Sequence, residues 1–315
     1  MTKKVITIFG ATGAQGGALA RAILSDPASE FAVRAITRKP QSDAAHALSK
    51  LGADVVAGDL DDAASVGRAM AGGYGAFCVT NFWEHFSPDK ELAQAKTMAQ
   101  AAAAAKLQHV VWSTLEDSRK FVVPGSGEMP VLMGKYNVPH FDAKGEANQF
   151  FVASGVPTTM LYTSFYWENL IYFGMAPTRG PDGKLSFALP MADKKLPGIA
   201  VQDIGKCTYG IFKRGTVMLG KSVGIAGEHL TGTQMAQQLI AAYGEPVTHN
   251  ALTPAQYRAL GFPGADDLGN MFEFNRDFED AFCAKRSLSE SRALNPELLT
   301  FGAWLAANKS QLPKQ

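Results

Sequence analysis

The first residues in this chain whose spacing could serve chemistry are glycines at positions 10, 13, 16 and 17. They follow directly on the mostly apolar residues 5–9, in the stretch VITIFGATGAQGG. Glycines between a strand and a helix let the backbone approach a pyrophosphate, and the helix start offers N–H groups and partial positive charge. The pattern predicts a phosphate cradle at the head of the chain. A glycine turn that only packs strand against helix is the competing interpretation.

The end of the second apolar segment, residues 31–37, indicates which cofactor the cradle would take. A protein that binds NAD(H) usually has Asp or Glu here to hold the ribose 2′-hydroxyl. This chain instead reads TRKP, so Arg38 and Lys39 replace the acid. A guanidinium can pair with a 2′-phosphate and lie over the adenine. We therefore expect NADP(H) rather than NAD(H), with a solvated Arg-Lys pair as the alternative.

A third candidate stretch, GDLDD at residues 58–62, follows the next apolar segment. Asp59 and Leu60 are placed to touch the adenine edge of a bound dinucleotide. Aspartate is also a favoured N-cap residue, and Asp61 or Asp62 is expected to cap the following helix. Capping is the competing interpretation for Asp59 as well.

A repeating β–α pattern positions these residues. Strands are predicted over residues 5–9, 31–37, 53–59, 75–81, 109–114 and 157–163, and helices over residues 14–26, 42–52, 62–72, 88–107 and 139–154. This alternation predicts an α/β fold with a doubly wound parallel sheet and helices on both faces. Residues 117–139 carry Gly, Pro and Met without a period and predict a loop.

The carboxyl-terminal half is expected to form a smaller lobe. We predict a dinucleotide-binding domain over residues 1–170 and a substrate or partner lobe over residues 171–315, with some segments returning to the first sheet. Within the lobe, a strand is predicted over 220–227 and helices over 231–244, 254–261 and 300–309.

The composition is that of an ordinary globular protein. The 315 residues are 46% hydrophobic and carry a net charge of +1, which argues against direct nucleic-acid binding. Three scattered cysteines form no CxxC and no disulfide framework, so we expect a reducing compartment and no metal site. The amino terminus lacks a signal-peptide core, and the longest uncharged stretch is interrupted by Gly155 and Pro157. A cytoplasmic protein without membrane contact is expected.

Together these stretches resemble the NmrA-like family, a branch of the atypical short-chain dehydrogenase/reductases. The resemblance is carried by FGATGAQGG, TRKP, VTNFWE, HFDAKGE, YWENL and LGFPGADDLGNMF, from residue 9 to about residue 275. It implies a Rossmann fold that binds NADP(H), with a small carboxyl-terminal lobe. The residues leave the oligomeric state open, and the resemblance implies exchange between monomer and homodimer.

The resemblance also assigns cofactor contacts along the chain. Those contacts fall on Gly10, Thr12, Gly13, Ala14, Gln15, Gly16, Arg38, Asp59, Leu60, Thr80, Asn81, Phe82, Lys144, Ser164, Phe165, Tyr166 and Trp167. Lys144 would reach the nicotinamide ribose, and residues 164–167 would flank the nicotinamide. For the aromatic residues among them, and for Trp83, packing in a core is the competing interpretation.

The catalytic position departs from the pattern of working reductases in this superfamily. Those enzymes use Tyr-x-x-x-Lys, which places both side chains on one helix face. Here the lysine is Lys144, but His140 occupies the place of the tyrosine, and Leu115 falls near the usual serine although Ser113 and Thr114 precede it.

Two functions follow from this departure. In the first, the protein binds NADPH or NADP⁺ as a redox sensor or regulator with little turnover and acts through an unknown protein partner. In the second, His140 or Tyr166 donates the proton, with Lys144, and the protein reduces a small quinone, enone or carbonyl.

Overall fold

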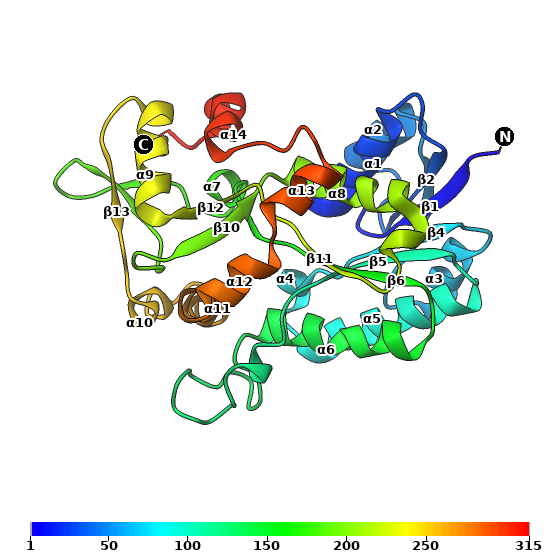
Figure 1. Ribbon diagram of the computed structural model, residues 1–315, viewed down its shortest axis with the longest axis horizontal. Coiled ribbons are helices and arrows are strands. Elements are labelled where there is room, and N and C mark those ends of the chain that lie inside the picture. The colour runs from blue at the N-terminus through cyan, green and yellow to red at the C-terminus, as the bar shows by residue number, and fades with distance from the viewer. Residues whose placement is uncertain (1, 315) are drawn as a thin grey trace. The chain divides into compact units, whose positions relative to one another are not determined.

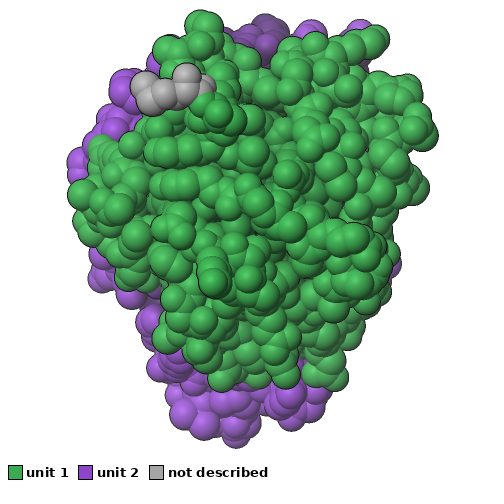
Figure 2. Space-filling view, turned by 90° about the vertical axis from the view of Figure 1, so that its right-hand side faces the viewer, with its two compact units in different colours: residues 1–117, 140–163, 201–223 green, residues 118–139, 164–200, 224–315 purple. Residues whose placement is uncertain are grey.

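A computed structural model describes residues 2–314. Contacts divide the chain into two compact units that interleave along the sequence (Figure 2). Unit 1 comprises residues 1–117, 140–163 and 201–223, and unit 2 comprises residues 118–139, 164–200 and 224–315. The division into domains predicted at residue 170 stays a prediction.

Unit 1 is built on a seven-stranded sheet in the order β11-β6-β5-β4-β1-β2-β3. The strands are β1 (Lys4–Ile8), β2 (Phe31–Thr37), β3 (Asp54–Ala57), β4 (Gly75–Cys78), β5 (His109–Thr114), β6 (Thr158–Tyr162) and β11 (Ser222–Gly224). From β3 across β1 to β6 all pairs are parallel. The strand order reverses between β1 and β4, and in such sheets ligands bind beyond the carboxyl ends of the strands at this switch point.

Helices cover both faces of this sheet (Figure 1). One face carries α1 (Ala14–Leu24), α2 (Asp43–Lys50) and α8 (Val201–Arg214), and the other carries α3 (Ala63–Met70), α5 (Pro88–Ala104) and α6 (Pro139–Ala153). The short helix α4 (Phe82–His85) follows β4. The predicted doubly wound α/β fold is therefore confirmed.

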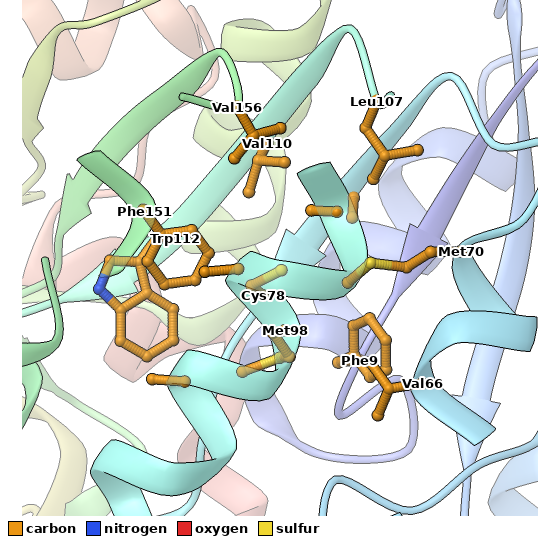
Figure 3. Close-up of a cluster of buried hydrophobic side chains, with 14 of the residues drawn as sticks. Phe9, Val66, Met70, Cys78, Met98, Leu107, Val110, Trp112, Phe151 and Val156 are labelled. Atoms are coloured by element: carbon orange, nitrogen blue, oxygen red, sulfur yellow. The ribbon is translucent and has the colours of Figure 1, made fainter. Parts of the chain in front are cut away.

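A hydrophobic cluster joins the sheet to α3, α5 and α6 (Figure 3). Ala95, Ala99 and Ala102 of α5 are completely buried and let the helix lie close to the strands. Their small side chains leave room for large ones, and Trp112 of β5 stacks on Phe151 of α6 with ring centroids 4.8 Å apart. This packing fixes the positions of β4, β5 and α6, which carry the candidate site.

The helix α8 was not predicted, although Ile204, Cys207 and Ile211 have helical spacing. Two glycines, Gly205 and Gly210, weaken the helical signal in the sequence. One of them has a packing reason: a Cβ atom on Gly205 would lie 2.5 Å from the backbone nitrogen of Leu19 in α1. The glycine therefore allows α8 to pack directly on the α1 backbone.

Unit 2 contains two three-stranded sheets and seven α-helices among the residues that the structure describes. The sheets are β12-β10-β7 and β13-β9-β8, built from β7 (Phe165–Tyr166), β8 (Thr178–Arg179), β9 (Leu185–Ala188), β10 (Lys195–Ile199), β12 (Glu228–Thr231) and β13 (Val247–Asn250). The helices are α7 (Asn169–Tyr172), α9 (Gly232–Tyr243), α10 (Pro254–Arg258), α11 (Ala265–Asp277), α12 (Glu279–Lys285), α13 (Leu288–Leu294) and α14 (Phe301–Asn308).

The helix predicted over residues 231–244 is present as α9 and is capped at both ends. Thr231 and Gln234 form a capping box at its start, and Gly244 ends it with φ of 77°. Across residues 2–314, no helix combines the length and the apolar character needed to cross a membrane.

A buried histidine makes the stability of unit 1 sensitive to acid. His109 of β5 is fully buried, with Nε2 2.9 Å from the Thr159 hydroxyl, which itself donates to the Met218 carbonyl. Its Nδ1 meets no hydrogen-bond partner among residues 2–314. Burial lowers the pKa of His109 from 6.5 to about 4.

We expect the free energy of unfolding to fall by about 3 kcal/mol between pH 6.5 and pH 4 on account of His109 alone. Below pH 6.5 the imidazole of His109 binds a proton in the unfolded chain but stays neutral in the folded chain until about pH 4. The free energy of unfolding therefore declines with falling pH. Urea unfolding at several pH values measures it, with His109→Asn as the comparison. An equal acid sensitivity of the variant and the wild type would contradict this origin.

Candidate functional site

The glycine loop connects β1 to α1 with the geometry that the sequence predicts. Gly10 has φ of 63°, which favours glycine, and its carbonyl accepts the Gly13 N–H at 2.9 Å. A Cβ atom on Gly16 would lie 2.5 Å from the Gly10 carbonyl oxygen, so any side chain there would push α1 away from β1. Gly13 is exposed and begins α1 without a side-chain cap, and no acidic residue stands in the first turn.

Such a loop can hold an anion. Its turn exposes Thr12, Gly13 and Ala14, and the partial positive charge of the start of α1 favours a phosphate there. Behind the turn, the Ser113 hydroxyl at the end of β5 donates to Gln15 Oε1 at 2.7 Å. The amide of Gln15 is therefore tied to the sheet.

Arg38 follows β2, as predicted, but it already has a partner. Its NH1 and NH2 groups both donate to the carboxylate of Glu84 on α4, the second at 3.0 Å. Both side chains are about half exposed. The shared hydrogen bonds raise the pKa of Arg38 and lower the pKa of Glu84.

The aspartates after β3 take separate roles. Asp62 caps α3 by accepting from the Ala64 N–H at 2.9 Å, and Asp61 accepts from the Gln94 side chain and pairs with Lys90. Asp59 closes a local turn by accepting from the Asp61 N–H, whereas Leu60 packs against the hydrophobic cluster. Asp62 is thus the N-cap, and the roles predicted for Asp59 and Leu60 at the adenine edge stay predictions.

Lys144 lies on α6 in a buried cluster with Thr80 and Glu91. Its ammonium donates to the Thr80 carbonyl at 3.1 Å, to the Thr80 hydroxyl at 2.7 Å and to Glu91 Oε1. The Thr80 hydroxyl donates in turn to Glu91 Oε1 at 2.6 Å. The three ammonium protons therefore all have acceptors within the protein, and the completely buried charge of Glu91 is neutralised.

His85, the last residue of α4, faces the other oxygen of Glu91. Its Nδ1 accepts from the Ser87 N–H at 3.1 Å, which places the proton of the neutral ring on Nε2. Nε2 is 3.6 Å from Glu91 Oε2, and neither atom has a hydrogen-bond partner among residues 2–314. Burial lowers the pKa of His85, so the ring is neutral at pH 7.

His140 lies one helical turn before Lys144 and is packed among aromatic rings. Its ring centroid is 4.7 Å from that of Trp83 and 6.0 Å from that of Phe82, both on α4. Phe82 is almost fully buried, whereas Trp83 is 38% exposed. The neighbouring Asn81 is exposed at the start of α4, and its side chain makes no cap hydrogen bond.

The hydroxyls at the end of β5 are engaged in structural contacts. Ser113 is bonded to Gln15, and the Thr114 hydroxyl lies 2.7 Å from Asn148 Oδ1 and 3.1 Å from the Lys144 carbonyl. The bonds of Thr114 hold α6 against β5.

The remaining predicted residues, Ser164–Trp167, belong to unit 2. The Ser164 hydroxyl donates to the Ile225 carbonyl, and β7 pairs with β10 at Phe165 and Tyr166. Trp167 is buried, with ring centroids 5.4 Å from Phe301 and 6.1 Å from Trp304. Trp167 therefore packs in the core of unit 2.

Three acidic or basic residues of unit 1 were not predicted from the sequence: Glu84, His85 and Glu91. Glu84 is the last residue of the VTNFWE stretch, and His85 follows it. Glu91 is one of several acids near the start of a long helix. The acid at a helix start reads as an ordinary N-terminal charge. Only the tertiary structure brings these residues to Arg38 and Lys144.

The sheet order and the glycine turn after β1 define a Rossmann-like α/β protein. The model of the NmrA-like family matches residues 2–305, so the chain belongs to the NmrA-like family. This confirms the family resemblance noted in the sequence.

Relatives and solved structures agree with this placement. The chain is 30% identical over 292 residues to the NmrA-like family domain-containing oxidoreductase lnbB of Aspergillus flavus, covering 87% of this chain and 84% of that protein. Its fold is similar to that of NmrA, a negative transcriptional regulator, in complex with NADP, with a TM-score of 0.77, 21% identity and coverage of 97% and 95%. It is also similar to the NADPH-dependent quinone oxidoreductase QOR2 of Escherichia coli in complex with NADPH, with a TM-score of 0.73, 23% identity and coverage of 98% and 99%.

Proposed function

We propose that unit 1 binds a nicotinamide dinucleotide, with NADP(H) preferred, and that the protein senses the NADPH/NADP⁺ ratio with little or no turnover. The observation that carries the binding proposal is the turn at Gly10–Gly16, an exposed glycine turn at the switch point of a parallel sheet. Arg38 supports the choice of NADP(H), because it follows β2 where an NAD(H) site has an acid. NmrA, the regulator with a similar fold, has been solved with NADP and also with NAD.

The residues at the expected catalytic position support low turnover. A general acid has to reach the reacting atom through one hydrogen bond or one water. The ring of His140 packs against the rings of Trp83, Phe82 and Phe141. The ammonium group of Lys144 donates its hydrogen bonds to Thr80 and Glu91.

A second candidate function is an NADPH-dependent reductase of a small quinone, enone or carbonyl. It is favoured by the relatives, since curated proteins that match over most of this chain are named oxidoreductases. In this function His140 or Tyr166 would donate the proton, and Lys144 would hold the nicotinamide ribose.

One set of measurements separates the two functions. We expect the wild type to quench or shift NADPH fluorescence on binding and to show no NADPH oxidation above background with a panel of quinones, enones and carbonyls. If the protein is a reductase, His140→Phe should bind NADPH normally and lose about 10²–10⁴-fold in turnover, the usual contribution of general acid catalysis.

The control is His46→Phe, the same change at an exposed histidine of α2, and Tyr166→Phe tests the second candidate proton donor. Sustained NADPH oxidation by the wild type that His140→Phe or Tyr166→Phe removes, and His46→Phe retains, would overturn the sensor proposal in favour of the reductase. Failure of NADPH to bind at all would overturn both.

A further inference from the structure

The guanidinium of Arg38 is occupied by a carboxylate from another element. Glu84 stands 46 residues further along the chain, yet its two oxygens accept from NH1 and NH2 of Arg38. This is the paired geometry in which arginine also binds a phosphate. A 2′-phosphate on the adenine ribose would need the same two donors.

Other charges around Arg38 are acidic as well. Asp59 and Asp61 both act electrostatically on Arg38, and Lys90 is engaged with Asp61 at 2.8 Å. A 2′-phosphate with a charge near −2 therefore meets Arg38 together with three carboxylates. Of the three, Glu84 is the one in contact with the guanidinium.

Glu84 also supplies a chemistry that is missing after β2. An acid at the end of this strand ordinarily accepts a hydrogen bond from the ribose 2′-hydroxyl of NAD(H). The chain has Arg38 at that place, and α4 brings a carboxylate to the same spot. One position therefore holds a donor pair suited to a phosphate and an acceptor suited to a hydroxyl.

We propose that Glu84 is a specificity-determining residue, which competes with the 2′-phosphate of NADP(H) for Arg38 and accepts the 2′-hydroxyl of NAD(H). The proposal rests on the proposed function, because it requires dinucleotide binding at the glycine turn. It makes the cofactor preference a balance between two side chains, with Arg38 favouring NADP(H) and Glu84 restraining that preference.

The test measures, for each variant, the ratio of the dissociation constants of NADH and NADPH at constant low ionic strength. We expect Glu84→Gln to raise this ratio by about 3- to 10-fold, as fits the loss of one half-exposed charge. Arg38→Ala should lower the ratio. The fragments 2′,5′-ADP and 5′-ADP should repeat both changes, because they differ only in the phosphate at issue.

The matched control is Glu245→Gln, which removes the same charge from a bidentate pair with Arg179 in unit 2. It should leave the ratio unchanged. A ratio in Glu84→Gln that equals or falls below the wild-type ratio overturns the proposal while dinucleotide binding stands. Absence of binding of both dinucleotides to a folded wild type overturns the proposed function as well. Because the ratio compares two ligands on one protein sample, partial loss of folded protein does not alter it.

Discussion

Replacing Lys144 with Met lowers the free energy of unfolding by about 3–5 kcal/mol, because it leaves the carboxylate of Glu91 buried without its cationic partner. Glu91 is completely buried, and in the variant its only remaining donor in the cluster is the Thr80 hydroxyl. Met has a similar length and no donor, so the change removes the charge with little change of volume. Urea unfolding measures the loss.

Two further variants test the cause. The double variant Lys144→Met/Glu91→Leu removes both charges and should recover most of the lost stability, since apolar replacements of a buried pair are often neutral. Lys4→Met, which breaks the exposed pair with Glu30, should cost less than about 1 kcal/mol. A loss in Lys144→Met no larger than in Lys4→Met would contradict the buried pair's role.

Replacing Gly13 with Val abolishes dinucleotide binding while the protein stays folded. A Cβ atom on Gly13 would lie 3.3 Å from one atom, the Gly10 carbonyl oxygen, so a shift of a few tenths of an ångström is enough for the fold to accept a side chain. The same side chain occupies the exposed turn that the pyrophosphate must approach. A loss of about 100-fold or more in NADPH affinity is expected, equivalent to one strong charge-assisted hydrogen bond.

The neighbouring glycine provides the contrast. A side chain on Gly16 would meet the carbonyl oxygens of both Phe9 and Gly10, so Gly16→Ala should lower the melting temperature as well as the affinity. Circular dichroism distinguishes the two variants. Normal NADPH affinity in folded Gly13→Val would mean that the loop is only a packing turn.

The first half of the fold was predictable because its signals are local. Within about fifteen residues, the sequence predicts a strand from the apolar run before Gly10 and helices from the apolar spacing of α1 and the alanines of α5. The parallel sheet then follows from the alternation of strands and helices. Unit 2 was less predictable, because β7 and β8 have two residues each, and strands of that length carry no period of two.

The candidate site shows the same division. The glycine turn was predictable from the spacing of its glycines, and Arg38 was predictable from its position after a strand. The partners of Arg38 and Lys144 are not, since Glu84 lies 46 residues from Arg38 and Glu91 lies 53 residues from Lys144. No local pattern encodes such pairs, and their positions depend on how β4 directs the chain into α4 and α5.

The packing of α8 on α1 has a consequence for the order in which the protein matures on the ribosome. The chain leaves the ribosome amino terminus first, so α1 and β1 emerge long before residues 201–214. Gly205 of α8 packs directly against the backbone at Leu19, so one side of α1 lacks its partner until residues 201–214 have been made. Contacts between such distant segments form slowly, because a long loop must close first. The nascent chain therefore exposes the side of α1 that packs on α8 until the whole of α8 has left the ribosome.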